Sequence, residues 1–164
     1  MSVLKTFWDE MGHYNELRLH TFMEGMLIPV EEVSDPVFSR NILGEGIAVI
    51  PEESLLISPI DGIVRHILRS AHSCCIEGAR GIELLLHIGL NTVEMNGRGF
   101  RLLVNEGQEV KAGDPLIRFS IEEIAESGYS PTSVLVITEM GEYDKVKFSP
   151  YGSVKKGDII AQIR

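Results

Sequence analysis

Two histidines, His72 and His87, are the residues of this sequence whose type and setting best suit chemistry. His87 lies near the end of an apolar run, residues 82–88, in which the side chains of a β-strand would alternate between two faces. The even-numbered aliphatic residues share one face, and His87 shares the other with Glu83 and Leu85. A single histidine in such a strand usually has a structural role.

A second imidazole changes that interpretation. Residues 71–77 can form a strand, residues 78–81 a turn of hairpin length, and residues 81–88 the returning strand. In this antiparallel pair, His72 and His87 lie near corresponding ends of neighbouring strands. Two imidazoles side by side on an apolar surface indicate either a metal pair or a phosphoryl site, because a neutral imidazole is a good nucleophile near pH 7.

The metal alternative needs more ligands than the two histidines supply. Zinc usually takes at least three protein ligands, and Cys74, on the face of His72, is the local candidate for a third. The sequence contains no Cys-x-x-Cys, His-x-His or His-Glu-x-x-His pattern. Zinc at His72 and His87 is therefore a minor possibility. A zinc-dependent hydrolase of a related sandwich fold stays an alternative hypothesis, although it needs a His-x-His pair.

The elements that must position these side chains are predominantly short strands. From about residue 17, apolar runs such as residues 62–68 and 133–137 alternate with Gly, Pro, Asn and Asp. This pattern is typical of a β-sandwich or β-barrel. One short helix is predicted over residues 120–128, where Ser120 and Glu123 form a capping box and Gly128 supplies the stop. Residues 1–16 differ from the rest and indicate a leader, helical or disordered.

One turn motif occurs twice. Residues 109–114 (Glu-Val-Lys-Ala-Gly-Asp) resemble residues 153–158 (Ser-Val-Lys-Lys-Gly-Asp), and each leads into an apolar run. Turns of this kind also occur in biotin- or lipoyl-type carrier domains, but the chain has no Met-Lys-Met or Asp-Lys-Ala sequence to carry such a group.

Composition narrows the class of protein. The chain has 164 residues and a formal net charge of −9, so we expect one domain and no nucleic-acid partner, since nucleic acid requires a basic surface. No apolar run approaches the length of a membrane span, so no direct membrane insertion is expected. The two cysteines are adjacent and predict reduced thiols, which favours a cytoplasmic location.

Several motifs taken in order make the chain recognisable. From about residue 17 to residue 164 it resembles the glucose-type IIA domain of the bacterial phosphoenolpyruvate-dependent sugar phosphotransferase system. The resemblance is carried by Asp35–Phe38, Gly44–Ala48, Ser58–Gly62, His72, His87–Phe100 and Gly107–Asp114. It implies an all-β fold, an antiparallel β-sandwich of the duplicated hybrid motif type with very short helices, formed by residues 17–164 after a leader of residues 1–16.

The resemblance also implies a phosphotransferase component. His87 matches the histidine that is phosphorylated, through Nε2, with Nδ1–H held by a backbone carbonyl, which we expect to be that of Gly89. His72 matches the partner imidazole that donates to the phosphoryl oxygens, and Ser70 matches a threonine beside it. Asn91 stands where the family commonly has an aspartate, so a charge beside the site is lost.

Partners follow from the same resemblance. They are the histidine-containing phosphocarrier protein, a IIB domain of a membrane sugar permease, and target proteins regulated by phosphorylation-dependent docking. No cofactor is required, although zinc bridging the two histidines in a regulatory complex is compatible with the sequence. The apolar rim expected to dock these partners comprises Val37, Phe38, Ile42, Leu43, Leu68, Leu85 and Val93.

Overall fold

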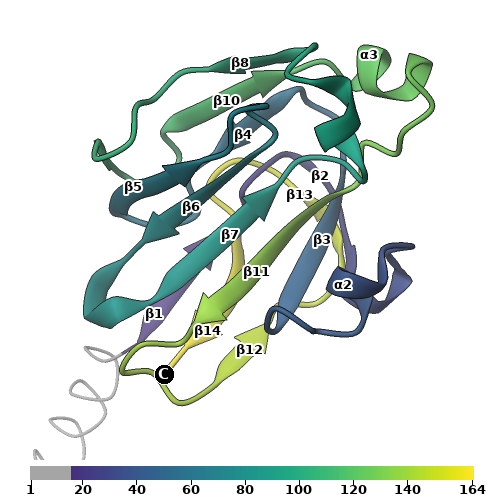
Figure 1. Cartoon of the computed structure of the whole chain (residues 1–164). Coiled ribbons are helices and arrows are strands. Elements are labelled where there is room, and N and C mark those ends of the chain that lie inside the picture. Colours follow the sequence, from purple (N-terminus) through teal and green to yellow (C-terminus); the bar gives the residue numbers. More distant parts are fainter. Residues whose placement is uncertain (1–15) are drawn as a thin grey trace, which may run out of the picture.

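The computed structural model describes residues 16–164, so the expected leader lies, except for Glu16, outside the described residues. Every strand pairing is antiparallel, and the described elements include only short helices, which confirms the predicted fold class (Figure 1). The strands are β1 (Leu17–His20), β2 (Gly25–Pro29), β3 (Gly46–Pro51), β4 (Leu55–Ile57), β5 (Gly62–Ile67), β6 (Ser73–Glu77), β7 (Glu83–His87), β8 (Phe100–Leu102), β9 (Glu109–Val110), β10 (Pro115–Phe119), β11 (Ser133–Glu139), β12 (Val146–Phe148), β13 (Gly152–Val154) and β14 (Ile159–Ile163). The short helices are η1 (Val30–Glu32), α2 (Pro36–Ser39), η2 (Ala79–Gly81), η3 (Thr92–Met95) and α3 (Ile121–Glu126).

Three sheets enclose the main core. The largest has the order β13-β2-β3-β11-β7-β6-β5-β9, and two three-stranded sheets have the orders β1-β14-β12 and β4-β10-β8. One cluster of buried aliphatic side chains draws members from all three, such as Leu84 of β7, Leu116 of β10 and Ile160 of β14. Burying these apolar surfaces against one another is the main term that stabilises the sandwich.

A second, smaller cluster covers part of the other face of the large sheet. The segment of η1 and α2 lies beside β3 (Figure 1) and places Val30, Val33 and Phe38 over Ala48 and Val134. Asp35 starts α2 by accepting the Val37 N–H at its Oδ1 (3.0 Å), and Pro36 occupies the first helical position. Because Val134 pairs with His87 in register, this covering segment borders the histidines.

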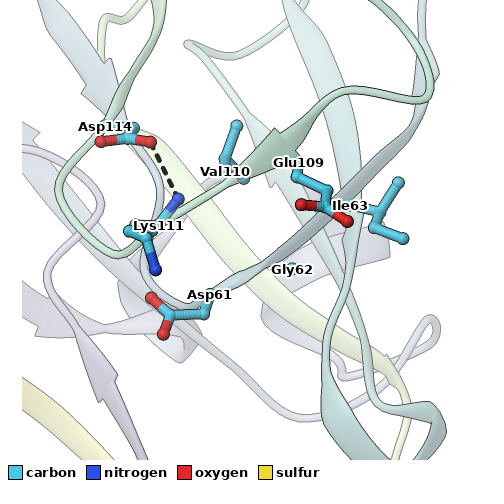
Figure 2. A pocket seen from close by; sticks show the side chains of 7 residues that line it. All are labelled: Asp61, Gly62, Ile63, Glu109, Val110, Lys111 and Asp114. Carbon is cyan, nitrogen blue, oxygen red and sulfur yellow. Dashed lines mark hydrogen bonds between the residues drawn. The ribbon is translucent and has the colours of Figure 1, made fainter.

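The repeated turn motif is a structural duplication. In the first copy the Lys111 N–H donates to Oδ2 of Asp114 (2.9 Å), as Figure 2 shows, and the Asp114 carbonyl accepts the Ser58 N–H. In the second copy the Lys155 N–H donates to Oδ2 of Asp158 (2.8 Å), and the Asp158 carbonyl accepts the Thr21 N–H. In each copy, therefore, the first hydrogen bond closes the turn and the second joins it to a distant segment, between β4 and β5 in the first copy and between β1 and β2 in the second.

The predicted helix is present as α3. Ser120 Oγ accepts the Glu123 N–H at 3.1 Å, which satisfies one of the free donors of the first turn, and Gly128 follows the helix with a φ of +88°. Among residues 16–164, no helix has the length and apolar character needed to cross a membrane.

Candidate functional site

The hairpin of β6 and β7 brings the two histidines together. Ser73 pairs with His87 in register, and the Ile88 N–H donates to the His72 carbonyl at 2.8 Å. The two imidazole centroids lie 4.9 Å apart at an interplanar angle of 78°. The predicted strand, turn and return strand are confirmed, and the strand alternation of β7 is as expected, with Leu84 and Leu86 buried and His87 half-buried on the opposite face.

Backbone geometry fixes the protonation of His87. Its Nδ1 lies 2.8 Å from the carbonyl oxygen of Gly89, and a carbonyl can only accept a hydrogen bond. Nδ1 therefore carries the proton, and in the neutral ring Nε2 keeps its lone pair. Burial lowers the pKa of His87, and the Gly89 hydrogen bond and the charge of Asp35 oppose that effect.

His72 lies deeper than His87. Only 2 % of His72 is exposed, and the Phe100 ring lies 6.4 Å from its ring. Burial, with a smaller contribution from the charge of His87, lowers the pKa of His72 to about 4, so its ring is neutral at pH 7. Ser70 Oγ lies 2.5 Å from Nδ1 of His72. When this hydroxyl donates to Nδ1, the single proton of the neutral ring is on Nε2.

The loop after β7 contributes one buried side chain, that of Thr92, that the sequence analysis did not single out. Thr92 is fully buried and its hydroxyl donates to the Ile88 carbonyl at 2.5 Å. Gly89 has a φ of +70°, and an added Cβ would lie 2.4 Å from Cγ2 of Thr92. Asn91, with a φ of +60°, precedes η3. The run of Gly, Asn and Thr after an apolar strand was the available signal for a tight, side-chain-bonded loop.

The expected docking residues divide into an exposed group and a covered pair. Five of the seven are exposed, from 40 % for Val37 to 64 % for Ile42, and we call them the apolar rim: Val37, Ile42, Leu43, Leu68 and Val93. Leu68 and Val93 line a hollow of about 450 Å³ together with Arg69, Ser70 and Asn96.

Phe38 and Leu85 lie beneath this rim rather than on it. Phe38 is 5 % exposed and its ring lies 5.0 Å from that of His87, while Leu85 is half-buried against the second cluster. The physical reason is that the segment of η1 and α2 folds over the outer face of the large sheet, where Phe38 is buried and Leu85 is partly covered. They shape the surroundings of His87 from below.

The expected third metal ligand does not face the histidine pair. Cys74 is 1 % exposed and its side chain belongs to the main core, where burial raises the pKa of its thiol to about 12. Within residues 16–164, no group of three or more His, Cys, Asp or Glu side chains is arranged to hold a metal ion. The arrangement instead offers a half-buried imidazole with a lone pair on Nε2 beside a second, neutral imidazole.

The fold and the site define an all-β sandwich with a pair of neighbouring imidazoles beside an apolar rim, and comparisons identify the family. Residues 17–143 match the family described as phosphoenolpyruvate-dependent sugar phosphotransferase system, EIIA 1. The chain belongs to this family, which confirms the resemblance seen in the sequence.

Individual relatives agree. The chain is 35 % identical over 142 residues to a glucose-specific EIIA component of Staphylococcus epidermidis (strain RP62A), with 87 % of this chain and 86 % of that protein covered. It is 36 % identical over 143 residues, with the same coverage, to the one from Staphylococcus aureus (strain MSSA476). Among solved structures, the glucose permease IIA from Mycoplasma capricolum superimposes with a TM-score of 0.86 at 33 % identity, covering 90 % of this chain and 96 % of that one.

Proposed function

We propose that this chain is a phosphoryl relay: His87 accepts a phosphoryl group from the histidine-containing phosphocarrier protein and passes it to a IIB domain during sugar uptake. The observation that carries the proposal is the Nδ1–H bond of His87 to the Gly89 carbonyl, which leaves Nε2 unprotonated on the half-buried ring. Family membership supports the same conclusion, and the names of the relatives make glucose the first sugar to test.

The transfer conserves atoms and charge. The nitrogen–phosphorus bond of the donor phosphohistidine breaks while a bond from Nε2 of His87 to phosphorus forms, and the donor nitrogen leaves with its electron pair. Nδ1 of His87 keeps its proton, so the phosphorylated ring is cationic and the Gly89 carbonyl stabilises that charge. In the second transfer, to the IIB domain, the Nε2–phosphorus bond breaks and the ring takes the electron pair, so it leaves as neutral imidazole. Because the Gly89 hydrogen bond keeps the proton on Nδ1, the ring does not have to leave as the much poorer leaving group imidazolate.

His72 supplies a donor without supplying a positive charge. With Ser70 donating to its Nδ1, the Nε2–H of His72 is free to donate to an oxygen of a phosphoryl group on the neighbouring ring. Such a hydrogen bond to a charged group contributes about 1.5–3 kcal/mol. Phosphoryl transfer depends mainly on positioning and on stabilising charge at the equatorial oxygens, which is what this neighbour provides.

The apolar rim suits partners that bind and leave. A mostly apolar contact below about 1,200 Å² of total buried surface is typical of transient complexes. Contact over Val37, Ile42 and Leu43 on one side and Leu68 and Val93 on the other would exclude water from the phosphohistidine. Regulated target proteins would use the same surface, and a phosphoryl group at its centre would change their binding through added charge.

The proposed relay needs no cofactor. It would take place in the cytoplasm, where its partners are expected. A zinc ion bridging His72 and His87 would need a further ligand from a partner, because residues 16–164 offer no third ligand beside them. This supports zinc only as a feature of a regulatory complex. Within residues 16–164, the hydrolase alternative likewise has no third ligand for a catalytic zinc beside the two histidines.

Phosphorylation with purified components tests the proposal. Supplied with phosphoenolpyruvate, the first enzyme of the system and the phosphocarrier, the protein gains the mass of one phosphoryl group, and peptide mapping places it on His87. His87→Gln gains none. His72→Gln is phosphorylated but donates to the IIB domain about ten- to hundredfold more slowly, as expected for loss of one charged hydrogen bond.

The exposed His66 of β5 offers a matched control, since His66→Gln should behave as the wild type in both steps. Labelling of His87→Gln at the wild-type level would refute the assignment of the nucleophile. Unimpaired donation by His72→Gln would remove the role given to His72.

A further inference from the structure

Ser133 is a buried residue that the relay described above does not use. It begins β11, far from His87 in the sequence, and its side chain is fully buried. Its Oγ accepts the Gly89 N–H at 3.1 Å and donates its own proton to the Pro131 carbonyl at 2.9 Å. Because the hydroxyl proton is committed to Pro131, a lone pair faces the Gly89 N–H.

The two peptide groups that flank Gly89 are held at every polar atom. In the first, the Ile88 carbonyl accepts from the Thr92 hydroxyl and the Gly89 N–H donates to Ser133. In the second, the Leu90 N–H donates to the Ser130 carbonyl at 2.9 Å, and the Gly89 carbonyl accepts from Nδ1 of His87. Three of these four hydrogen bonds lead to fixed anchors, and the fourth leads to the reactive ring.

This arrangement sets the direction of the Gly89 carbonyl. A glycine with a φ of +70° has wide conformational freedom of its own, so the direction of its carbonyl must come from its hydrogen bonds. The Leu90 N–H anchor holds the carbonyl's own peptide group, and the Ser133 anchor holds the peptide group before it. Loss of the Ser133 hydroxyl would leave the buried Gly89 N–H without a hydrogen-bond partner. A change of loop conformation that gives this N–H a new partner would then be favourable.

We propose that Ser133 is a positioning residue for phosphoryl transfer, which holds the Gly89 carbonyl against Nδ1 of His87 and so keeps the ring in the tautomer with Nε2 free. The inference rests on the proposed function of His87, but its physical content, the tautomer of an unphosphorylated ring, is measurable without any partner. Ser133 acts through Gly89 and does not touch the phosphoryl group.

The test compares Ser133→Ala with a matched variant, Ser58→Ala. Ser58 is also fully buried and its hydroxyl donates to a backbone carbonyl, that of Ile60, at 2.7 Å, remote from the histidine loop. Nitrogen-15 NMR of the ring measures the ratio of the two His87 tautomers in the free protein. Ser133→Ala is expected to lower the ratio of Nδ1–H to Nε2–H forms by about tenfold, the effect of one ordinary hydrogen bond, and to slow phosphorylation as the fraction of the Nδ1–H form falls.

Ser58→Ala loses stability by a similar mechanism and keeps the wild-type tautomer ratio and rate. Ser133→Thr, which retains the hydroxyl, restores most of both. A wild-type tautomer ratio in folded Ser133→Ala would overturn the inference. If Ser133→Ala does not fold, amide hydrogen exchange of Gly89 in the wild type decides, because exchange as fast as that of an exposed amide would show that Ser133 does not hold it.

The two proposals fail in different ways. A wild-type protein that gains no phosphoryl group on His87 refutes the relay and leaves the tautomer measurement to be judged by itself. A wild type that is phosphorylated normally, with Ser133→Ala matching it in ring tautomer and rate, refutes only the positioning role.

Discussion

Lowering the pH should destabilise this protein through His72. In the folded protein its pKa is about 4, against 6.5 for the ordinary side chain, because the buried ring resists charge. The unfolded chain therefore binds more protons between these values, so stability is fully present above about pH 6.5 and falls as the pH drops toward 4. Integrating this difference from about pH 7.5 to about pH 5 gives a loss of roughly 2 kcal/mol in the free energy of unfolding.

Urea unfolding of the wild type, His72→Gln and His66→Gln at both pH values measures this contribution. The wild type and the His66→Gln control should lose about 2 kcal/mol more than His72→Gln over the interval. His87, whose pKa burial also lowers, remains in all three proteins and so does not account for the difference. Equal losses of unfolding free energy in the wild type and His72→Gln would refute the claim that the folded protein keeps His72 buried and neutral.

Three further predictions concern positions around the site and the fold that supports it. Gly89→Ala should lower the free energy of unfolding in urea by at least about 1 kcal/mol and slow phosphorylation, because φ is +70° and the added Cβ would meet Thr92. Wild-type stability in this variant would contradict the expected backbone strain and clash. Ser120→Ala should cost about 1 kcal/mol through loss of the α3 cap while phosphorylation is unchanged, and an unaltered midpoint would show the cap to be dispensable. Ile42→Ser should change the free energy of unfolding by less than about 0.5 kcal/mol but raise the phosphocarrier concentration needed for half-maximal rate. The control Ile50→Ser, at an exposed β3 position paired with Met26, should leave that concentration unchanged. Equal effects of the two variants would argue against docking on the rim.

Local patterns predicted the elements that depend on near neighbours. The alternation in residues 82–88 predicted a strand with His87 on its outer face, and the short connection to residues 71–77 predicted the hairpin. The Ser120–Glu123 spacing predicted a cap whose donor and acceptor are three residues apart. In each case the interacting residues are close in the sequence, so residue type and spacing carry enough information to predict the contact.

Contacts between distant segments were beyond such patterns. Several apolar runs in the sequence predict strands equally well, so such a run alone does not show that β11 lies between β3 and β7 or that Ser133 meets Gly89. The burial of Phe38 likewise depends on the segment of η1 and α2 folding over the outer face of the large sheet, which residue type alone does not reveal. The Gly89 carbonyl was predicted because it lies two residues from His87, whereas the residues that aim it were not.

The roles of the two histidines follow from their depth and from what binds each Nδ1. A backbone carbonyl can only accept, so it obliges His87 to place its proton on Nδ1 and leaves a lone pair on Nε2, the atom proposed as the nucleophile. A serine hydroxyl can donate, so Ser70 allows the buried, neutral His72 to present an N–H at Nε2 instead. Exchanging these two neighbours would exchange the chemistry of the two rings. The different roles proposed for the two rings therefore depend on Gly89 and Ser70 as much as on the imidazoles themselves.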